Sequence, residues 1–136
     1  MKSLCPNLKF TDKKVLVLGF SKSGISAARY LNSAGAEVYI TEAREQKPED
    51  TEKLRELREL GINIEMGGHS EEFIKDAYIA VTSPGIPPRA DIMQKLKENK
   101  IKVISEIELA ASQTGAPFIA ITGTNGKTTT TALTAH

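Results

Sequence analysis

The chain has 136 residues and a formal net charge of +1, and 40% of its residues are hydrophobic while 26% are charged. This balance is ordinary for a soluble globular protein, and it provides no overall attraction to nucleic acid or to an anionic membrane. The only cysteine, Cys5, excludes an internal disulfide, and the sequence contains neither an 18-residue apolar run nor a secretory apolar stretch at its start. We therefore expect a cytoplasmic protein with no membrane partner and no nucleic-acid partner.

The first predicted element is a strand at residues 15–18, where four consecutive apolar residues are typical of a parallel strand buried on both faces. A turn of small residues at 19–24 follows, and a helical pattern begins after it. Such a turn directs backbone N–H groups and the positive end of a helix dipole at one point, which suits a diphosphate. Gly19 permits a tight turn and Gly24 a close helix, but Ser21 replaces a glycine of the dinucleotide fingerprint, which disfavours NAD.

Further apolar runs alternate with helical patterns as far as residue 105. We expect strands at 37–41, 62–66, 77–82 and 102–104, and helices at 50–60 and 91–99. Strands separated by helices imply parallel pairing with right-handed crossovers. The sequence therefore predicts an α/β fold, a Rossmann-like doubly wound sheet of about five strands over residues 12–105.

Polar residues and turns follow two of these strands at the edge where ligands bind in such folds. Glu42 is placed to contact a ribose or a base, or it is a solvated loop carboxylate. Arg44 could cover a base, pair with a phosphate, or remain a free surface arginine. The turn at 83–85 allows close approach of a ligand, or is a plain turn. His69 is expected to be a turn residue, and no histidines or cysteines are spaced for a metal cluster.

A second phosphate loop is the strongest motif in the chain. We expect a buried strand at 118–121, then the loop, then the start of a helix. In this pattern Gly126 lets the backbone wrap phosphate oxygens, Lys127 supplies a point charge, and the Thr128 hydroxyl reaches Mg²⁺. Ile121 replaces a glycine of the general pattern. The predicted ATP-binding residues are Gly123, Thr124, Asn125, Gly126, Lys127, Thr128 and Thr129.

Two domains are expected from this order of elements. A helix at 105–112 ends a nucleotide-binding domain at residues 1–112, and residues 113–136 begin a second α/β domain that is truncated. The tail would then pack on the first domain, or pair with another copy of the chain across an exposed strand edge. The sequence therefore predicts possible self-association through the tail, although the full-length protein is expected to be a monomer.

Residues 122–129 resemble the ATP loop of the bacterial Mur ligases of peptidoglycan synthesis, a loop that folylpolyglutamate synthases share. The segments 19–24, 42–44, 83–86 and 105–108 resemble the first domain of the D-glutamate-adding members of that family. The resemblance implies an ATP-dependent ligase that phosphorylates UDP-N-acetylmuramoyl-L-alanine and joins the resulting acyl phosphate to D-glutamate, with Mg²⁺ offsetting charge. It also implies that the remaining catalytic residues lie beyond His136, so the chain alone holds none and should not turn over.

The resemblance assigns roles to particular positions. Lys22 and Ser23 would lie beside the UDP diphosphate. Ala43 stands where relatives use a threonine hydroxyl towards uracil. The implied UDP-sugar contacts are Lys22, Ser23, Glu42, Ala43, Arg44, Ser83, Pro84 and Gly85, the middle three towards uracil and the last three near the muramoyl sugar. Lys127 and Thr128 would hold the ATP phosphates and Mg²⁺.

Three other interpretations remain open at the level of sequence. A nicotinamide-dependent oxidoreductase or NAD-sensing module is favoured by the strand–turn–helix and Glu42, and disfavoured by Ser21 and the second loop. A phosphate-loop switch would need a magnesium-binding acid on a later strand. A scaffold domain without catalysis is the last alternative.

Overall fold

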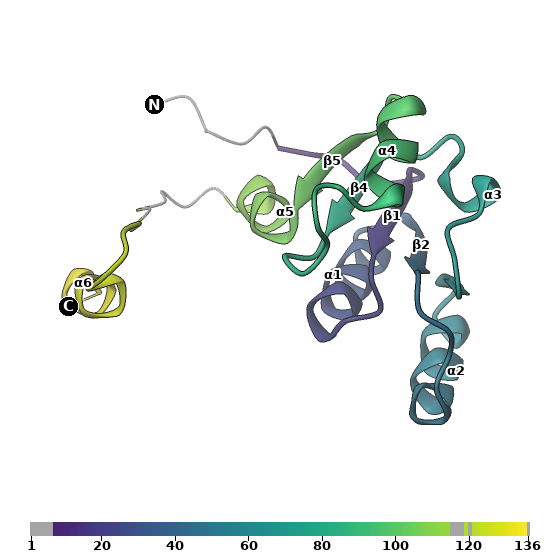
Figure 1. The fold of residues 1–136 in the computed structure, drawn as a ribbon, viewed down its shortest axis with the longest axis horizontal. Helices are drawn as coiled ribbons and strands as arrows, with labels where there is room; N and C mark the ends of the chain where they lie inside the picture. Colours follow the sequence, from purple (N-terminus) through teal and green to yellow (C-terminus); the bar gives the residue numbers. More distant parts are fainter. Residues whose placement is uncertain (1–6, 115–118, 120, 136) are drawn as a thin grey trace.

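The computed structural model describes residues 7–114, 119 and 121–135, so Cys5 lies outside the described residues. The chain forms a five-stranded parallel sheet with helices on both faces (Figure 1). The strands are β1 (Lys14–Leu18), β2 (Glu37–Glu42), β3 (Asn63–Met66), β4 (Ile79–Thr82) and β5 (Lys102–Ser105). Their order, β3-β2-β1-β4-β5, confirms the predicted doubly wound sheet.

The helices are α1 (Lys22–Ser33), α2 (Thr51–Glu59) after a 3₁₀ turn at Pro48–Asp50, α3 (Glu71–Ile74), α4 (Asp91–Glu98), α5 (Glu106–Gln113) and α6 (Lys127–Thr134). Helices α1 to α4 lie between successive strands of the parallel sheet, and α5 and α6 follow β5. Only α3 was not predicted, because a four-residue helix has no apolar periodicity to reveal it. No described helix has the length and apolar character needed to cross a membrane.

Strand β1 explains why the sheet is buried on both faces. Its side chains alternate, so Val15 and Val17 pack in the core beneath α1, α2 and α5, while Leu16 and Leu18 pack in the core that includes α3 and α4. All four are at most 1% exposed. A continuous apolar run is therefore what this position needs, since neither face of the strand meets water.

The described part of the tail differs from its prediction. Of the expected strand at 118–121, Phe118 and Ala120 lie outside the described residues, Ile119 is 74% exposed, and neither Ile119 nor Ile121 is in a strand. Helix α6 forms as predicted but buries none of its residues. Figure 1 shows α6 set apart from the sheet and its helices. The prediction that the tail packs on the first domain is therefore wrong for the described residues.

Candidate functional site

The two predicted ligand loops of the first domain meet where the sheet reverses its order. Strands β1 and β4 are hydrogen-bonded neighbours, yet the chain continues from β1 to β2 on one side and from β4 to β5 on the other. The loops that leave their carboxyl ends, residues 19–24 and 83–85, therefore flank one crevice. This is the position at which open α/β sheets bind ligands.

The first loop is held in shape by its own backbone and by β2. Gly19 has a backbone φ of 99°, which residues other than glycine rarely adopt. Its N–H donates to the Thr41 carbonyl at 2.9 Å. A Cβ on Gly24 would stand 2.5 Å from the Gly19 carbonyl oxygen, so helix α1 can approach the strand only with glycine there. The expected roles of both glycines are confirmed.

The start of α1 leaves two backbone donors open. The Ser21 hydroxyl is the N-cap and accepts from the Gly24 N–H at 3.1 Å. No acceptor in the described part of the chain takes the N–H groups of Lys22 and Ser23. Both side chains are exposed, and the Lys22 ammonium has no partner among the described residues. The positive end of α1 thus presents two amides and one cation to an anion.

Glu42 faces the loop instead of free solvent. One carboxylate oxygen accepts the Phe20 N–H at 2.8 Å, and the other accepts the Arg44 N–H at 3.0 Å. The carboxylate therefore joins the end of β2 to the first loop while keeping lone pairs for a further donor. Ala43 beside it is exposed and carries no polar side-chain group.

Arg44 is committed to a partner that the sequence analysis did not identify. Its guanidinium donates two hydrogen bonds to the Asp50 carboxylate, at 2.6 and 3.1 Å, and lies 5.9 Å from the centre of the Phe20 ring. The hydrogen bonds from Arg44, and then from the Lys47 N–H, lower the pKa of Asp50 to about 2. The pair fixes the guanidinium beside the first loop, where a flat base could stack on it.

The turn after β4 divides into a buried and an exposed part. Ser83 is 7% exposed, and its hydroxyl donates to Glu106 at 2.7 Å and contacts the Ser21 hydroxyl at 3.1 Å. Pro84 and Gly85 are exposed, with no atom within 4 Å of a Cβ built on Gly85. The open space predicted at Gly85 is present, whereas the Ser83 side chain faces inward.

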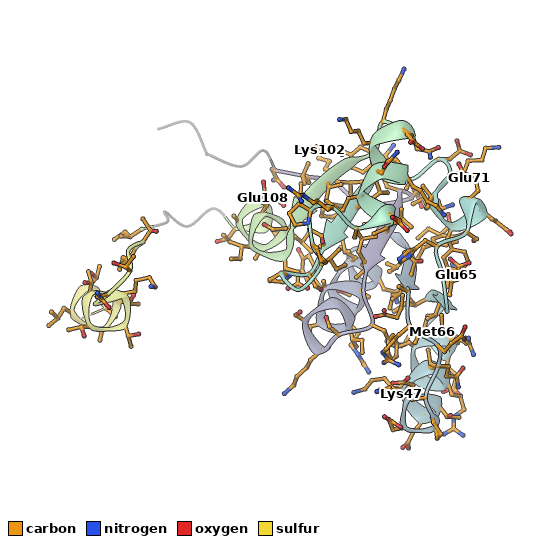
Figure 2. All side chains as sticks on the ribbon, in the orientation of Figure 1. Lys47, Glu65, Met66, Glu71, Lys102 and Glu108 are labelled. Atoms are coloured by element: carbon orange, nitrogen blue, oxygen red, sulfur yellow. The ribbon has the colours of Figure 1, made fainter. Side chains whose placement is uncertain are left out.

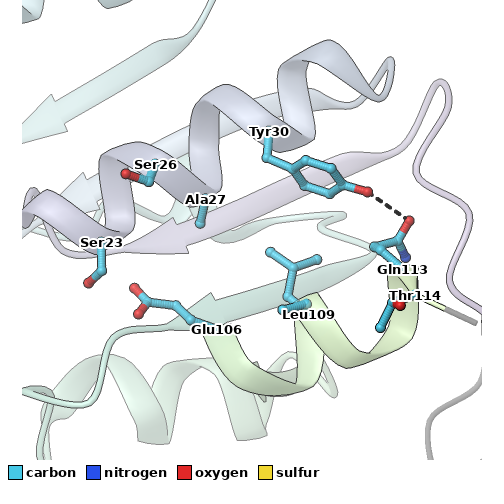
Figure 3. Close-up of a pocket in the computed structure, with 9 residues that line it drawn as sticks. Ser23, Ser26, Ala27, Tyr30, Glu106, Leu109, Gln113 and Thr114 are labelled. Carbon is cyan, nitrogen blue, oxygen red and sulfur yellow. Dashed lines mark hydrogen bonds between the residues drawn. The ribbon is translucent and has the colours of Figure 1, made fainter. Parts of the chain in front are cut away.

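A groove of about 580 Å³ runs between α1 and α5, and Glu106, which accepts from Ser83, is one of the residues that line it. Figure 3 shows Ser23 and Glu106 facing one another at one end, and Tyr30 donating to Gln113 at the other, a hydrogen bond of 3.1 Å. Its walls include Ala27 and Leu109. Glu106 thus borders both the groove and the turn at 83–85, whereas the sequence analysis assigned it no role of its own within the segment 105–108.

The second loop has the helix that its motif requires, but not a described strand before it. Gly126 caps α6 with a φ of 75°, and the Lys127 ammonium donates to the Gly123 carbonyl at 2.6 Å. The hydroxyls of Thr130 and Thr131 bond back to carbonyls one turn earlier. Those of Thr128 and Thr129 have no partner among the described residues, and every residue from 122 to 135 is exposed.

These features suit phosphate oxygens, because a left-handed glycine, a helix start, a lysine and an unpaired hydroxyl lie together. A phosphate could replace the Gly123 carbonyl as the partner of Lys127, and Thr128 and Thr129 both have hydroxyls that are not used within the described residues. Among the described residues, no group of three or more histidine, cysteine, aspartate or glutamate side chains could hold a metal by itself. The described contacts do not bring this loop to the first one.

His69 makes more contacts than a plain turn residue. Its Nδ1 lies 2.7 Å from the buried Thr41 hydroxyl, and its carbonyl accepts from Lys95 at 2.8 Å. Burial, and then the charge of Lys95, lower the pKa of the imidazole. His69 therefore supports the residue whose carbonyl holds Gly19. No local sequence signal connects positions 41 and 69, since the contact depends on the pairing of β2 and β3.

Comparisons with known proteins agree with this geometry. A sequence model of the family described as "Mur ligase MurD-like, N-terminal domain" matches residues 13–105. UDP-N-acetylmuramoylalanine–D-glutamate ligases of Geotalea daltonii and Cytophaga hutchinsonii are 42% and 45% identical, over 93% and 92% of this chain. The chain spans 28% of the length of each of these relatives.

A solved structure is similar across both the sheet and much of the rest of the chain. It is a pseudomurein peptide ligase type C from Methanothermus fervidus, which is 29% identical with a TM-score of 0.64. The match covers 88% of this chain and 24% of that one. The likeness in fold is therefore to about a quarter of a larger protein.

Proposed function

The chain belongs to the MurD-like Mur ligase family through its N-terminal domain, and from this premise we propose that it is the UDP-nucleotide-binding part of a peptidoglycan ligase. The complete protein would be a cytoplasmic, ATP-dependent acid–amino-acid ligase that adds D-glutamate to UDP-N-acetylmuramoyl-L-alanine. This reaction would contribute to cell-wall biogenesis, on which cell shape and cell division depend. The full-length protein would act as a monomer.

The observation that carries the proposal is the anion-binding start of α1 at the switch point of the sheet. The open N–H groups of Lys22 and Ser23, together with the Lys22 ammonium, would hold the UDP diphosphate. Uracil would lie towards Glu42, Ala43 and Arg44 at the end of β2. The sugar would pass over the exposed Pro84 and Gly85.

The residue at position 21 favours UDP over a nicotinamide dinucleotide. The dinucleotide fingerprint has a glycine there, which lets the pyrophosphate approach the backbone closely, whereas Ser21 places a side chain at this point and its hydroxyl accepts the Gly24 N–H. The amides of Lys22 and Ser23 would remain for the UDP diphosphate, and Glu42 keeps lone pairs for a donor of the uracil.

The second loop would belong to the ATP site of the complete enzyme. Gly123 to Thr129 would surround the phosphates, with Lys127 beside them and the Thr128 hydroxyl on Mg²⁺. ATP would supply the phosphoryl group that activates the substrate carboxylate, and Mg²⁺ would offset its charge. Among the residues of this chain we assign binding roles and no acid, base or nucleophile, so we expect residues 1–136 to bind nucleotide without turnover.

Calorimetric titration of residues 1–136 tests this function. We expect UDP and UDP-N-acetylmuramoyl-L-alanine to bind, NADH not to bind, and Lys22→Ala to weaken UDP binding. Lys97→Ala is the matched control, since Lys97 is an equally exposed lysine on α4, away from the crevice. Tight NADH binding without UDP binding would replace the ligase with an oxidoreductase or NAD-sensing module.

A further inference from the structure

We propose that Glu106 is a positioning residue that fixes the first loop in its anion-binding shape through Ser83 and Ser21. Three hydrogen bonds connect α5 to α1 across the crevice. The Ser83 hydroxyl donates to Glu106 at 2.7 Å, Ser83 and Ser21 are 3.1 Å apart, and Ser21 accepts from the Gly24 N–H at 3.1 Å. We call this set, Glu106–Ser83–Ser21–Gly24, the serine chain.

Proton counting gives the serine chain one direction. A hydroxyl has one proton, and the Ser83 proton is used on the Glu106 carboxylate, which only accepts. The bond between the two serines must then be donated by Ser21 to Ser83. Since the Ser21 proton is used in this way, its lone pairs are left for the Gly24 N–H and for the Ser23 hydroxyl at 3.3 Å. Glu106 thus orients every hydroxyl of the serine chain.

The same counting changes the role expected for Ser83. Its side chain is buried, its proton is committed, and its oxygen would lie 3.5 Å from a Cβ at Gly24. It therefore has no proton to give a phosphate oxygen. An anion at the crevice meets the amides of Lys22 and Ser23 instead, and their direction depends on the N-cap that Ser83 supports.

Glu106 is well suited to anchor the serine chain because its own position does not depend on a ligand. It is the first residue of α5, where a negative charge is stabilised by the helix dipole. The capping box between Ser105 and Glu108 fixes that end of α5, with the two hydrogen bonds at 3.1 and 2.7 Å. The hydrogen bond to Ser83 is charge-assisted, which makes it the strongest link of the chain.

Amide hydrogen exchange in the absence of ligand tests the serine chain directly. In Glu106→Ala and Ser83→Ala we expect the Gly24 amide to exchange about two- to tenfold faster, as for the loss of one hydrogen bond. Glu106→Gln should restore slow exchange, because its amide oxygen still accepts from Ser83. Glu71→Ala is the matched control, since Glu71 is likewise the first residue of a helix, α3, and its loss should leave the exchange of Gly24 unchanged. Unchanged Gly24 exchange in Glu106→Ala overturns the inference.

Affinity for UDP tests the consequence for binding, and this step rests on the proposed function. Glu106→Ala and Ser83→Ala should each weaken UDP binding about two- to tenfold, and the double variant should be no weaker than either. The control Glu71→Ala should leave UDP affinity unchanged. If Glu106→Ala and Glu106→Gln both tighten binding, Glu106 is only a repelling charge and the inference fails.

The two readouts separate the two possible failures. Absence of UDP binding by the unaltered chain would remove the proposed function, while the exchange of Gly24 would still decide whether the serine chain exists. Normal UDP binding with unaltered exchange in Glu106→Ala would keep the function and remove the serine chain.

Discussion

The molecule contains two glycine-bearing loops with similar local chemistry and opposite surroundings. The loop at 19–24 joins β1 to α1, and its backbone and side chains bond to β2 and to the turn after β4, which is itself bonded to α5. The loop at 123–126 starts α6, and its described hydrogen bonds stay within the loop and helix. Gly24 is buried, whereas Gly123 and Gly126 are exposed. The motif alone therefore does not determine how firmly a loop is held.

The difference in contacts between the two loops shows which residues preorganise an anion site. At the first loop, distant residues such as Thr41, Glu42 and Glu106 fix the direction of the amides before a ligand arrives. At the second loop, Lys127 donates to a carbonyl of its own loop, so a phosphate must displace that contact. Preorganised donors lose less ordering entropy on binding. We therefore expect the first loop to be the stronger site in this chain.

The largest effect should come from Gly24→Ala. In an ordinary helix this change stabilises by about 1 kcal/mol, but here the new Cβ would lie 2.5 Å from the Gly19 carbonyl oxygen. We expect a loss of about 2–3 kcal/mol in the free energy of unfolding, as for an overpacked core. Urea denaturation measures it. Gly126→Ala, with no atom within 4 Å of its Cβ, should leave the unfolding of the sheet unchanged; a stabilised Gly24→Ala would refute the close approach.

The next effect concerns ligand affinity. Removing the Lys22 ammonium should weaken UDP binding about tenfold, or about 1.4 kcal/mol, because this exposed cation lies at the start of α1. For the unaltered chain, we expect ATP to bind at least about tenfold more weakly than UDP, because the second loop must rearrange. Calorimetry with both nucleotides measures the contrast. Equal affinities would show that the surroundings of the two loops do not matter.

A smaller effect should appear in the pH dependence of stability. The pKa of Asp50 is about 2 in the folded chain, below its usual 3.8, so the unfolded state binds the proton more readily. The stabilisation by Arg44 is therefore complete above about pH 4 and is lost as the pH falls through about 2. Asp50→Asn should be less stable than the unaltered chain at pH 6, and the difference should shrink at pH 2. A constant difference across that range would exclude the ion pair as its source.

The smallest effect should follow removal of residues 115–136. Because α6 buries no residue, the chain 1–114 should unfold within about 0.5 kcal/mol of the full chain, the range of surface changes. Tyr30, Gln113 and the α1–α5 groove remain in the shorter chain. Light scattering on both forms also tests the predicted self-association through the tail. Identical monomer masses would remove that prediction.

The sequence was sufficient for the sheet because the central strands β1 and β4 are compact apolar runs, and because apolar residues alternate with polar ones in β3. Strand β1, predicted at 15–18, begins one residue earlier, and β4, predicted at 77–82, begins two residues later. The apolar run at 118–121 predicted a buried strand, but Ile119 is exposed. An apolar run is buried only where a neighbouring strand or helix packs on it, and Ile119 has no such neighbour in the described part of the chain.

The site was predictable where its chemistry is local and not where it depends on pairing. Gly19 and Gly24 could be placed from the strand–turn–helix pattern, whereas Lys22 was assigned only through the resemblance. The partners of Asp50 and Glu106 could not be predicted, because they are a side chain across a loop and one across the crevice. The turn that carries Ser83 could be placed, but the direction of its hydroxyl could not, because only the fold brings Glu106 to it.

The two outer strands bear on whether copies of the chain would stack into a continuous sheet. Strands β3 and β5 each have four residues, and Figure 2 labels charged side chains on both, Glu65 and Lys102. An incoming strand would gain few ladder bonds and would meet a charge at either side. Addition of a further copy at β3 or β5 would therefore be less favourable than at a long apolar edge strand.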